Sequence, residues 1–332
     1  MAQHEIRLNK ASGDWVIIAP SRGKRPDDFQ REEKLKSLPE YDANCPFCKG
    51  NEEDLPDILL QIGNDDENWH TRVVPNKFPA VHREKDTERY STGIYTAMPG
   101  YGVHEVILEH PHHNQDMATM SRENAESVIE TYHRRMTDLM MGHQNMLPIL
   151  FRNHGANAGT SLHHPHSQLI ITGFVPSHIR HRENEAQRYF DKFGRCVFCE
   201  ILEFERSEAI RTVFENDSFL AFVPYAAESP FEVWIMPKQH QADFCEIDDH
   251  QKKGLTEALQ GVLTQLHDQL KDPDYNYIIN TAARYKADEP QLHWYIQVRP
   301  RLTTRAGFEI GSGISINPSV PEEDAKYLRN EE

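Results

Sequence analysis

The chain has 332 residues, of which 38% are hydrophobic, and carries a formal net charge of -16 at pH 7. This length suffices for one large domain or two smaller ones with cores of their own, and the negative charge argues against nucleic acid as a partner. The sequence has neither an apolar run of the roughly 18–20 residues that span a bilayer nor an apolar N-terminal signal segment. We therefore expect a cytoplasmic protein that does not bind membranes.

The first half of the chain contains a hairpin, a Cys-x-x-Cys pair, strands and a helix. Residues 6–20, IRLNKASGDWVIIAP, are typical of a β-hairpin around a Gly-containing turn. Cys45 and Cys48 form the cysteine pair, and strand-like runs such as EVILEH follow it. A helix is predicted from Ser121, a residue type that favours the N-cap. Its apolar face consists of Ala125, Val128, Tyr132, Met136 and Leu139.

The second half repeats this order. Cys196 and Cys199 form another Cys-x-x-Cys pair, the strand-like run EVWIMP follows, and a helix is predicted after Asp248 and Asp249. The segment from Thr303, TTRAGFEIGSGISINPSVPEE, is rich in Gly and Pro and is predicted to be irregular. The apolar face of the second helix consists of Leu255, Leu259, Val262, Leu266 and Leu270.

The two copies together predict the fold. Each supplies strands and an amphipathic helix in the same order, which favours an α+β protein of two modules. We expect antiparallel sheets with packed helices, joined into one larger sheet. The predicted N-terminal module comprises residues 1–185, and the C-terminal module comprises residues 186–332.

Each copy also supplies two cysteines and two histidines at matching positions. In a reducing compartment, Cys-x-x-Cys pairs are more often metal ligands or redox centres than disulfides, and a Cys2His2 set is the closed chemistry of structural zinc. Two structural zinc sites are predicted, with buried core cysteines as the alternative. The choice of His113 over His110 or His112 rests on the register of the repeat. The predicted ligands are Cys45, Cys48, His113 and His164 in the first site, and Cys196, Cys199, His240 and His293 in the second.

The run SLHHPHSQLII places His164, His166 and Gln168 at alternate positions, so on a strand these side chains point the same way. A neutral imidazole held by its other nitrogen is a competent nucleophile toward phosphorus. Upstream, the loop RNHGANAGTS offers backbone N–H groups to phosphate. Ser161 in this loop can donate to the leaving phosphate, and Gln168 can bond a nonbridging oxygen. Tyr295 replaces His166 in the second copy, which predicts one catalytic and one scaffolding half; an ordinary strand histidine is the alternative for His166.

These motifs resemble the galactose-1-phosphate uridylyltransferase branch of the histidine-triad superfamily. The resemblance runs from SRGKRP near residue 21 to GFEIGSG near residue 307, and His-Pro-His-Ser-Gln, ending at Gln168, is its most specific piece. It implies two fused histidine-triad-like modules, the second with a degenerate active site. Hydrolases of the superfamily usually carry a third His at the position of Gln168, which favours transfer over hydrolysis. The implied reaction is uridylylation of His166 by UDP-glucose, release of glucose 1-phosphate and transfer to galactose 1-phosphate.

The resemblance also implies a homodimer, with sites completed across its interface, and roles for further residues. The arginines of SRGKRP resemble residues that meet substrate phosphates, a task that suits the planar guanidinium; solvated surface charges are the alternative. The implied contacts are Arg22 and Arg25 with phosphates, Asn76 with the nucleoside, Asn153, Gly159 and Ser161 in the phosphate loop, and Phe308 and Glu309 with the hexose.

Two departures keep other functions open. Lys77 stands where the uridylyltransferases carry Asp, and PNKFPA and AGFEIGSG resemble the ADP-glucose phosphorylase branch equally well. The alternative is an adenylyltransferase that acts on ADP-glucose, or a similar AMP anhydride, with phosphate as the acceptor. A nucleotide hydrolase and a zinc-stabilised nucleotide-binding protein are alternatives of other classes.

Overall fold

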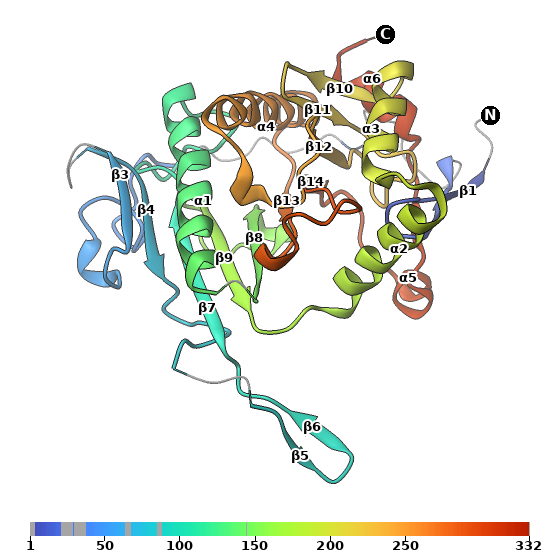
Figure 1. Ribbon diagram of the computed structural model, residues 1–332. Coiled ribbons are helices and arrows are strands. Elements are labelled where there is room, and N and C mark those ends of the chain that lie inside the picture. The colour runs from blue at the N-terminus through green and yellow to red at the C-terminus, as the bar shows by residue number, and fades with distance from the viewer. Residues whose placement is uncertain are drawn as a thin grey trace.

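The centre of the protein is one antiparallel sheet of ten strands in the order β10-β11-β12-β14-β13-β8-β9-β7-β4-β3 (Figure 1). The structure is a computed structural model, and it describes residues 4–20, 29, 38–63, 68–84, 88–143 and 145–331. The strands of the first half are β3 (Leu60–Gly63), β4 (Trp69–Pro75), β7 (Gly102–Leu108), β8 (Leu147–His154) and β9 (His166–Thr172). Those of the second half are β10 (Thr212–Glu215), β11 (Phe219–Phe222), β12 (Val233–Pro237), β13 (Tyr275–Asn280) and β14 (Tyr295–Pro300).

The two halves of the chain meet in the middle of this sheet. β8 pairs with β13, with Leu150 opposite Ile279 and His154 opposite Tyr275. Strands from both copies of the repeat therefore share one hydrogen-bonded ladder. The predicted α+β fold, with antiparallel sheets joined into one, is confirmed.

Two long helices, α1 (Arg122–Gly142) and α4 (Asp249–Leu270), cover one face of the sheet (Figure 1). Both begin where the sequence predicts. The Ser121 hydroxyl accepts a backbone N–H of the first turn at 3.2 Å, and Asp248 and Gln251 form a capping box. The apolar faces of both helices are buried in one core cluster with β7, β9, β13 and β14.

Two further helices, α2 (Ser177–Phe193) and α3 (Val197–Glu208), belong to a second core cluster on the opposite face of the sheet. Leu202 of α3 packs there in the same cluster as Trp234. These helices were not among the elements predicted from the sequence. Helix α2 is mostly polar, and Ala186 is its one buried residue. A short apolar stripe of this kind gives a weak periodic signal.

The N- and C-terminal parts of the chain form a smaller sheet. The predicted hairpin is present as β1 (Glu5–Leu8) and β2 (Trp15–Ile18), and β15 (Ser315–Asn317) pairs with β2 in parallel. A separate hairpin, β5 (Tyr90–Thr92) and β6 (Tyr95–Ala97), projects from the body of the protein (Figure 1). No helix in the described ranges combines the length and apolar composition that a membrane crossing requires. Short 3-10 helices lie at η3 (Glu52–Asp54), η4 (Ala156–Ala158), η5 (Phe244–Glu246) and η6 (Arg284–Lys286).

The prediction that the segment from Thr303 is irregular is wrong. This segment forms α5 (Gly307–Ser312), the strand β15 and α6 (Pro321–Leu328). Its Gly and Pro residues act as helix boundaries: Gly313, at φ 75°, ends α5, and Pro321 lies in the first turn of α6. Composition alone does not distinguish a boundary residue from a loop residue.

The main core can be tested at Leu259, which is fully buried on α4. We expect Leu259→Ala to lower the free energy of unfolding by about 2–5 kcal/mol, because the lost methyl groups leave a cavity. Denaturant unfolding followed by circular dichroism measures this change. Lys253→Ala, at an exposed position on the same helix, should change it by less than about 0.5 kcal/mol. Equal losses in the two variants would contradict the assignment.

Candidate active site and metal centres

His166 begins β9 with one ring nitrogen held by the backbone. Its Nδ1 donates to the His164 carbonyl oxygen at 2.8 Å, because a carbonyl can only accept. Nε2 therefore carries the lone pair. The ring is buried and packs edge-on against Phe47, with centroids 5.4 Å apart. Burial lowers the pKa of His166, with the bond to the carbonyl opposing this effect, so the neutral, nucleophilic ring is favoured at pH 7.

Gln168 is oriented by a histidine that the sequence analysis missed. The Ala80 N–H donates to Nδ1 of His104 at 3.1 Å, which places the His104 proton on Nε2. That N–H donates to Oε1 of Gln168 at 2.9 Å. With Oε1 engaged, the NH2 group of Gln168 remains as a donor for a phosphate oxygen. The signal in the sequence was the alternation of His104 with Val106 and Leu108, which puts all three on one face of β7.

The loop after β8 is shaped by glycines and one carboxylate. Gly155 has φ 83°, and a Cβ there would lie 2.1 Å from Oδ1 of Asp274, so this position requires glycine. Oδ2 of Asp274 accepts the Asn157 N–H at 2.7 Å. Gly159, at φ 88°, ends η4 in the left-handed conformation. The backbone N–H groups of residues 157–160 donate to acceptors within the protein, so the phosphate-binding role of this loop stays a prediction.

Three other predicted contact residues lie on elements next to His166. Asn153 is on β8, the strand that pairs with β9. Ser161 is exposed in the connection that leads into β9. Asn76 follows β4, and its Nδ2 lies 3.1 Å from Nε2 of His104. The structure thus groups these residues around one face of the first-half sheet.

Two predicted residues lie elsewhere within one chain, and two others cannot be placed. Arg22 and Arg25 lie outside the described residues. Phe308 and Glu309 are on α5, which Figure 1 shows well apart from β9, the strand that begins at His166. Phe308 is exposed, so its ring is available for a contact outside this chain.

On the other face of β9 lies a buried polar network. Glu109 and Arg152 form an ion pair whose side chains are 0% and 2% exposed. The Glu109 carboxylate also accepts a hydrogen bond from Tyr132 of α1 at 2.5 Å and one from Ser167 of β9. The Tyr277 hydroxyl lies 2.6 Å from that of Tyr132. Burial raises the pKa of Tyr132 well above its usual value, so its hydroxyl stays protonated as a donor. These additional hydrogen bonds offset the cost of removing the Glu109–Arg152 ion pair from water.

Glu109 holds the residues on both sides of His166. Its backbone N–H donates to the Pro165 carbonyl at 3.0 Å, and its carboxylate accepts from the Ser167 hydroxyl. The nucleophile strand is therefore fixed at two successive points by one residue. Glu109 is not recognisable as a site residue from the sequence, because an acidic residue at a strand end is usually a surface residue.

The four predicted ligands of the first metal site converge. The ligand atoms of Cys45, Cys48, His113 and His164 lie within 4.8 Å of one another, and all four residues are buried. Nε2 of His164 donates to the His110 carbonyl at 2.8 Å, which leaves Nδ1 facing the Cys48 sulfur at 3.6 Å. Burial lowers the pKa of His164 to about 3 and raises that of Cys45 to about 11. The imidazole is thus a neutral ligand, whereas a buried thiolate needs a cation. This donor set fits zinc.

The second metal site repeats this geometry. The ligand atoms of Cys196, Cys199, His240 and His293 also lie within 4.8 Å of one another. Nε2 of His293 donates to the Pro237 carbonyl at 3.0 Å, and Nδ1 of His240 and of His293 lie 3.2 and 3.5 Å from the Cys199 sulfur. A histidine that ligates a metal commonly donates its other N–H to a carbonyl in this way.

The second half keeps this arrangement of cysteines and histidines but has no counterpart of His166. Tyr295 begins β14, where His166 begins β9, and Gln297 occupies the place of Gln168. Gln297 donates to Glu232 at 2.7 Å. Burial raises the pKa of Tyr295, so its phenol is protonated at pH 7 and is a poor nucleophile. Among the described residues of the second half, the position that corresponds to His166 is therefore occupied by a phenol and not by an imidazole.

Both halves of the chain match one protein family. Residues 1–176 match the N-terminal domain of galactose-1-phosphate uridyl transferase, and residues 182–312 match its C-terminal domain. The chain is 34% identical to ADP-glucose phosphorylase of Arabidopsis thaliana over 330 residues, which covers 98% of this chain and 92% of the relative. It is 29% identical to galactose-1-phosphate uridylyltransferase of Thermotoga maritima over 338 residues, with coverage of 99% and 98%.

Solved structures show the same similarity. The crystal structure of an ADP-glucose phosphorylase from Arabidopsis thaliana with bound ADP-glucose matches with a TM-score of 0.85 and 31% identity, over 100% of this chain and 99% of that one. A uridylyltransferase structure matches with a TM-score of 0.76 and 25% identity, over 99% and 98%. The chain therefore belongs to the galactose-1-phosphate uridyl transferase family and is a nucleotidyltransferase.

Proposed function

We propose that the protein transfers a nucleotidyl group through a covalent bond to Nε2 of His166. The observation that carries this proposal is the orientation of the ring: Nδ1 is bonded to the His164 carbonyl, so Nε2 presents its lone pair. The same carbonyl stabilises the positive charge that the imidazole acquires when Nε2 is substituted. A neutral, oriented imidazole is an effective nucleophile at phosphorus.

The reaction takes two displacements at one phosphorus atom. Nε2 of His166 attacks the α-phosphorus of a nucleoside diphosphate sugar; a P–N bond forms, the P–O bond to the bridging oxygen breaks, and a sugar 1-phosphate leaves. An oxygen of the acceptor phosphate then attacks the same phosphorus, and the P–N bond breaks. The proton on Nδ1 remains there throughout, so His166 returns to its neutral state.

Supporting roles are assigned to residues around the nucleophile. Gln168, held at Oε1 by His104, offers its NH2 group to a nonbridging oxygen, and the exposed hydroxyl of Ser161 serves the leaving phosphate. These donors act where charge develops in the transition state. The remaining proposed contacts are Asn76 with the nucleoside, Asn153, Gly159, Arg22 and Arg25 with phosphates, and Phe308 and Glu309 with the hexose.

The proposed donor is a nucleoside diphosphate glucose. The higher identity to the ADP-glucose phosphorylase than to the uridylyltransferase reported above favours ADP-glucose, with phosphate as the acceptor. Lys77, which departs from the uridylyltransferase pattern, points the same way. UDP-glucose with galactose 1-phosphate as the acceptor is the second candidate, and the full-length similarity to the uridylyltransferase supports it.

Residues 1–185 are proposed to form the catalytic module and residues 186–332 the supporting module; the boundary between the two family domains, at residues 176–182, supports this division. A homodimer is proposed because α5 lies apart from β9, the strand that begins at His166, in one chain (Figure 1). A second copy could then bring Phe308 and Glu309 to the substrate.

All five cysteines are free of disulfides, which supports the predicted cytoplasmic location.

Each Cys2His2 set is proposed to hold one structural zinc ion. Four protein ligands complete a tetrahedral shell and leave no position for water or substrate. Bound zinc would therefore cross-link the cysteine-containing segments to β9 and β14 without entering the reaction.

Incubation with ADP-glucose or, separately, UDP-glucose in the absence of acceptor tests the covalent step. Intact-protein mass spectrometry should show one added AMP or UMP, which is lost in His166→Ala and retained in His163→Ala, a change at an exposed neighbour. Phosphate should discharge an AMP adduct as ADP, and galactose 1-phosphate should discharge a UMP adduct as UDP-galactose. An adduct that survives in His166→Ala, or none with either donor, would refute the proposal. Rapid loss in buffer alone would indicate a hydrolase.

The two metal sites are tested by Cys48→Ser and Cys199→Ser. Each variant should lose one zinc ion per chain by elemental analysis and should unfold several degrees below the unchanged protein, since metal binding contributes to folding. Cys245→Ser is the control, because Cys245 belongs to neither Cys2His2 set. Equal thermal midpoints for metal-free and metal-loaded protein would count against structural zinc.

The positioning role of Glu109 is tested by Glu109→Gln, which removes the charge that faces Arg152 and keeps the shape. We expect a loss of about 3–5 kcal/mol in unfolding free energy and at least roughly ten-fold slower adduct formation on His166, because a misplaced nucleophile reacts slowly. Glu105→Gln is the control: Glu105 is 1% exposed on the same sheet face and pairs with Arg135, but does not contact the nucleophile strand's ends. It should destabilise the fold without slowing the adduct in folded protein; equal slowing would contradict the role.

A further inference from the structure

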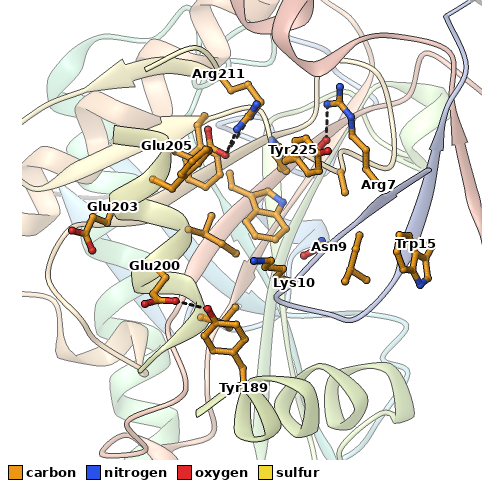
Figure 2. A pocket seen from close by; sticks show the side chains of 18 of the residues that line it. Arg7, Asn9, Lys10, Trp15, Tyr189, Glu200, Glu203, Glu205, Arg211 and Tyr225 are labelled. Carbon is orange, nitrogen blue, oxygen red and sulfur yellow. Dashed lines mark hydrogen bonds and ion pairs between the residues drawn. The ribbon is translucent and has the colours of Figure 1, made fainter. Parts of the chain in front are cut away.

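Several charged side chains beside β1 and α3 pair with one another around a cavity of about 960 Å³ (Figure 2). Arg211 pairs with Glu205 at 2.9 Å, and the Tyr189 hydroxyl donates to Glu200. These polar groups are engaged within the chain, so they do not select a ligand. A cluster elsewhere in the protein has an excess of one charge.

This cluster consists of two carboxylates and one histidine from three separate elements. His154 ends β8, Asp116 precedes α1, and Asp272 follows α4. Each residue offers one ligand atom, and the three atoms lie within 4.8 Å of one another. Ligand atoms about 2.1 Å from one ion lie at most about 4.2 Å apart. Small rotations of these half-buried side chains therefore suffice for all three to bind the same ion.

The cluster carries two negative charges when its histidine is neutral. Nε2 of His154 lies 2.8 Å from Oδ1 of Asp272, whereas Oδ1 of Asp116 accepts two backbone N–H groups of the following turn, at 2.8 and 3.2 Å. Partial burial lowers the pKa of the nearby His267, but its bond to Asp268 and the charges of Asp272 and Asp116 outweigh this effect and raise it. The negative potential thus extends beyond the cluster, and a divalent cation would offset it.

The hydroxyl of Tyr275 is an independent sign of a ligand. Tyr275 lies opposite His154 in the ladder between β13 and β8, and the two rings stack with centroids 4.6 Å apart. The residue is 4% exposed, yet its hydroxyl has no hydrogen-bond partner among the described residues. Burial raises the pKa of Tyr275, Arg152 opposes this effect, and Asp116 adds to it, so the hydroxyl feels the charge of the cluster. An unpaired buried hydroxyl is costly, and water bound to an ion there would pair with it.

We propose that Asp116, His154 and Asp272 form a third metal site, for a divalent ion of the manganese class. Carboxylates suit hard ions, and the imidazole favours a transition metal among them. Three protein ligands leave positions for water. The ion would replace the proton between His154 and Asp272, which moves to Nδ1 of the imidazole.

The position of this site suggests what the ion would do. His154 directly precedes Gly155 of the predicted phosphate loop, and Asp272 belongs to the second half of the chain. His154 alternates with Arg152 on β8, and Arg152 lies opposite Ser167, so the site is on the sheet face opposite to His166. The ion would therefore join the two halves beside the loop without entering the reaction.

Electron paramagnetic resonance during titration with Mn²⁺ alone tests the site, because Mn²⁺ competes poorly for the thiolates of the Cys2His2 sets. Protein washed with a weak chelator, with its zinc content measured before and after, should bind one Mn²⁺ per chain. Asp272→Asn and His154→Gln should bind Mn²⁺ at least about ten-fold more weakly, since each removes a ligand. Asn also tolerates the left-handed backbone of Asp272, at φ 55°.

Asp268→Asn is the matched control, because it removes one carboxylate from a position that is 63% exposed and outside the cluster. It should bind Mn²⁺ as tightly as the unchanged protein. Mn²⁺ should raise the thermal midpoint of this control and of the unchanged protein but not that of Asp272→Asn.

Circular dichroism checks that each variant is folded, and Asp116→Asn replaces any variant that is not. No binding to the unchanged protein at millimolar Mn²⁺, or equal affinities in the unchanged protein and the folded ligand variants, would overturn the proposal. Neither outcome depends on the chemistry at His166.

Discussion

The geometry of the nucleophile strand depends on one buried carboxylate. Glu109 is removed from water and satisfied by Arg152, Tyr132 and Ser167, and a charge in that position tolerates little displacement, because any broken bond leaves it unpaired in a medium of low dielectric constant. His166 lies between Pro165 and Ser167, the two residues that Glu109 binds. The rigidity of the network on one face of the sheet is thus transmitted to the reactive side chain on the other. Such fixed geometry lowers the reorganisation that a displacement at phosphorus requires.

The proposed zinc ion and the nucleophile are linked through two carbonyl groups. The His110 carbonyl holds the ring of His164, a proposed zinc ligand, and the His164 carbonyl holds the ring of His166, the proposed nucleophile. A metal ion without catalytic function would therefore still determine where Nε2 points. In the second half, His293 donates to a backbone carbonyl in the same way. The residue two positions later, however, is Tyr295 and not a histidine. The two halves share one device for orienting a ligand, and one of them adds a reactive group to it.

Features that follow from local periodicity could be predicted from the sequence, and features that depend on distant pairs could not. The apolar spacing in the sequence predicts helices α1 and α4. The alternation of His164, His166 and Gln168 predicts the strand and the sheet face on which these side chains lie. The register of the repeat selected His113 over its neighbouring histidines, and the structure groups His113 with the cysteines. Glu109 and His104 escaped notice because their partners, Arg152 and Gln168, are far away in sequence. Neither the polar helix α2 nor the Gly-rich helix α5 has the regular spacing of apolar residues from which a helix is predicted.

The continuous ladder between β8 and β13 has a consequence for how natural variation in this protein would be tolerated. Because the hydrogen-bonded ladder is continuous across β8 and β13, we expect the two halves to unfold together as one cooperative unit. A change in the second-half strands, away from the proposed substrate contacts on α5, would then reduce the number of folded molecules while leaving the turnover of each one intact. In a cell, losses of about 1–2 kcal/mol alter protein abundance several-fold. Selection on these strands would accordingly act on the amount of enzyme present, and substitutions there would resemble changes in gene dosage more than changes in chemistry.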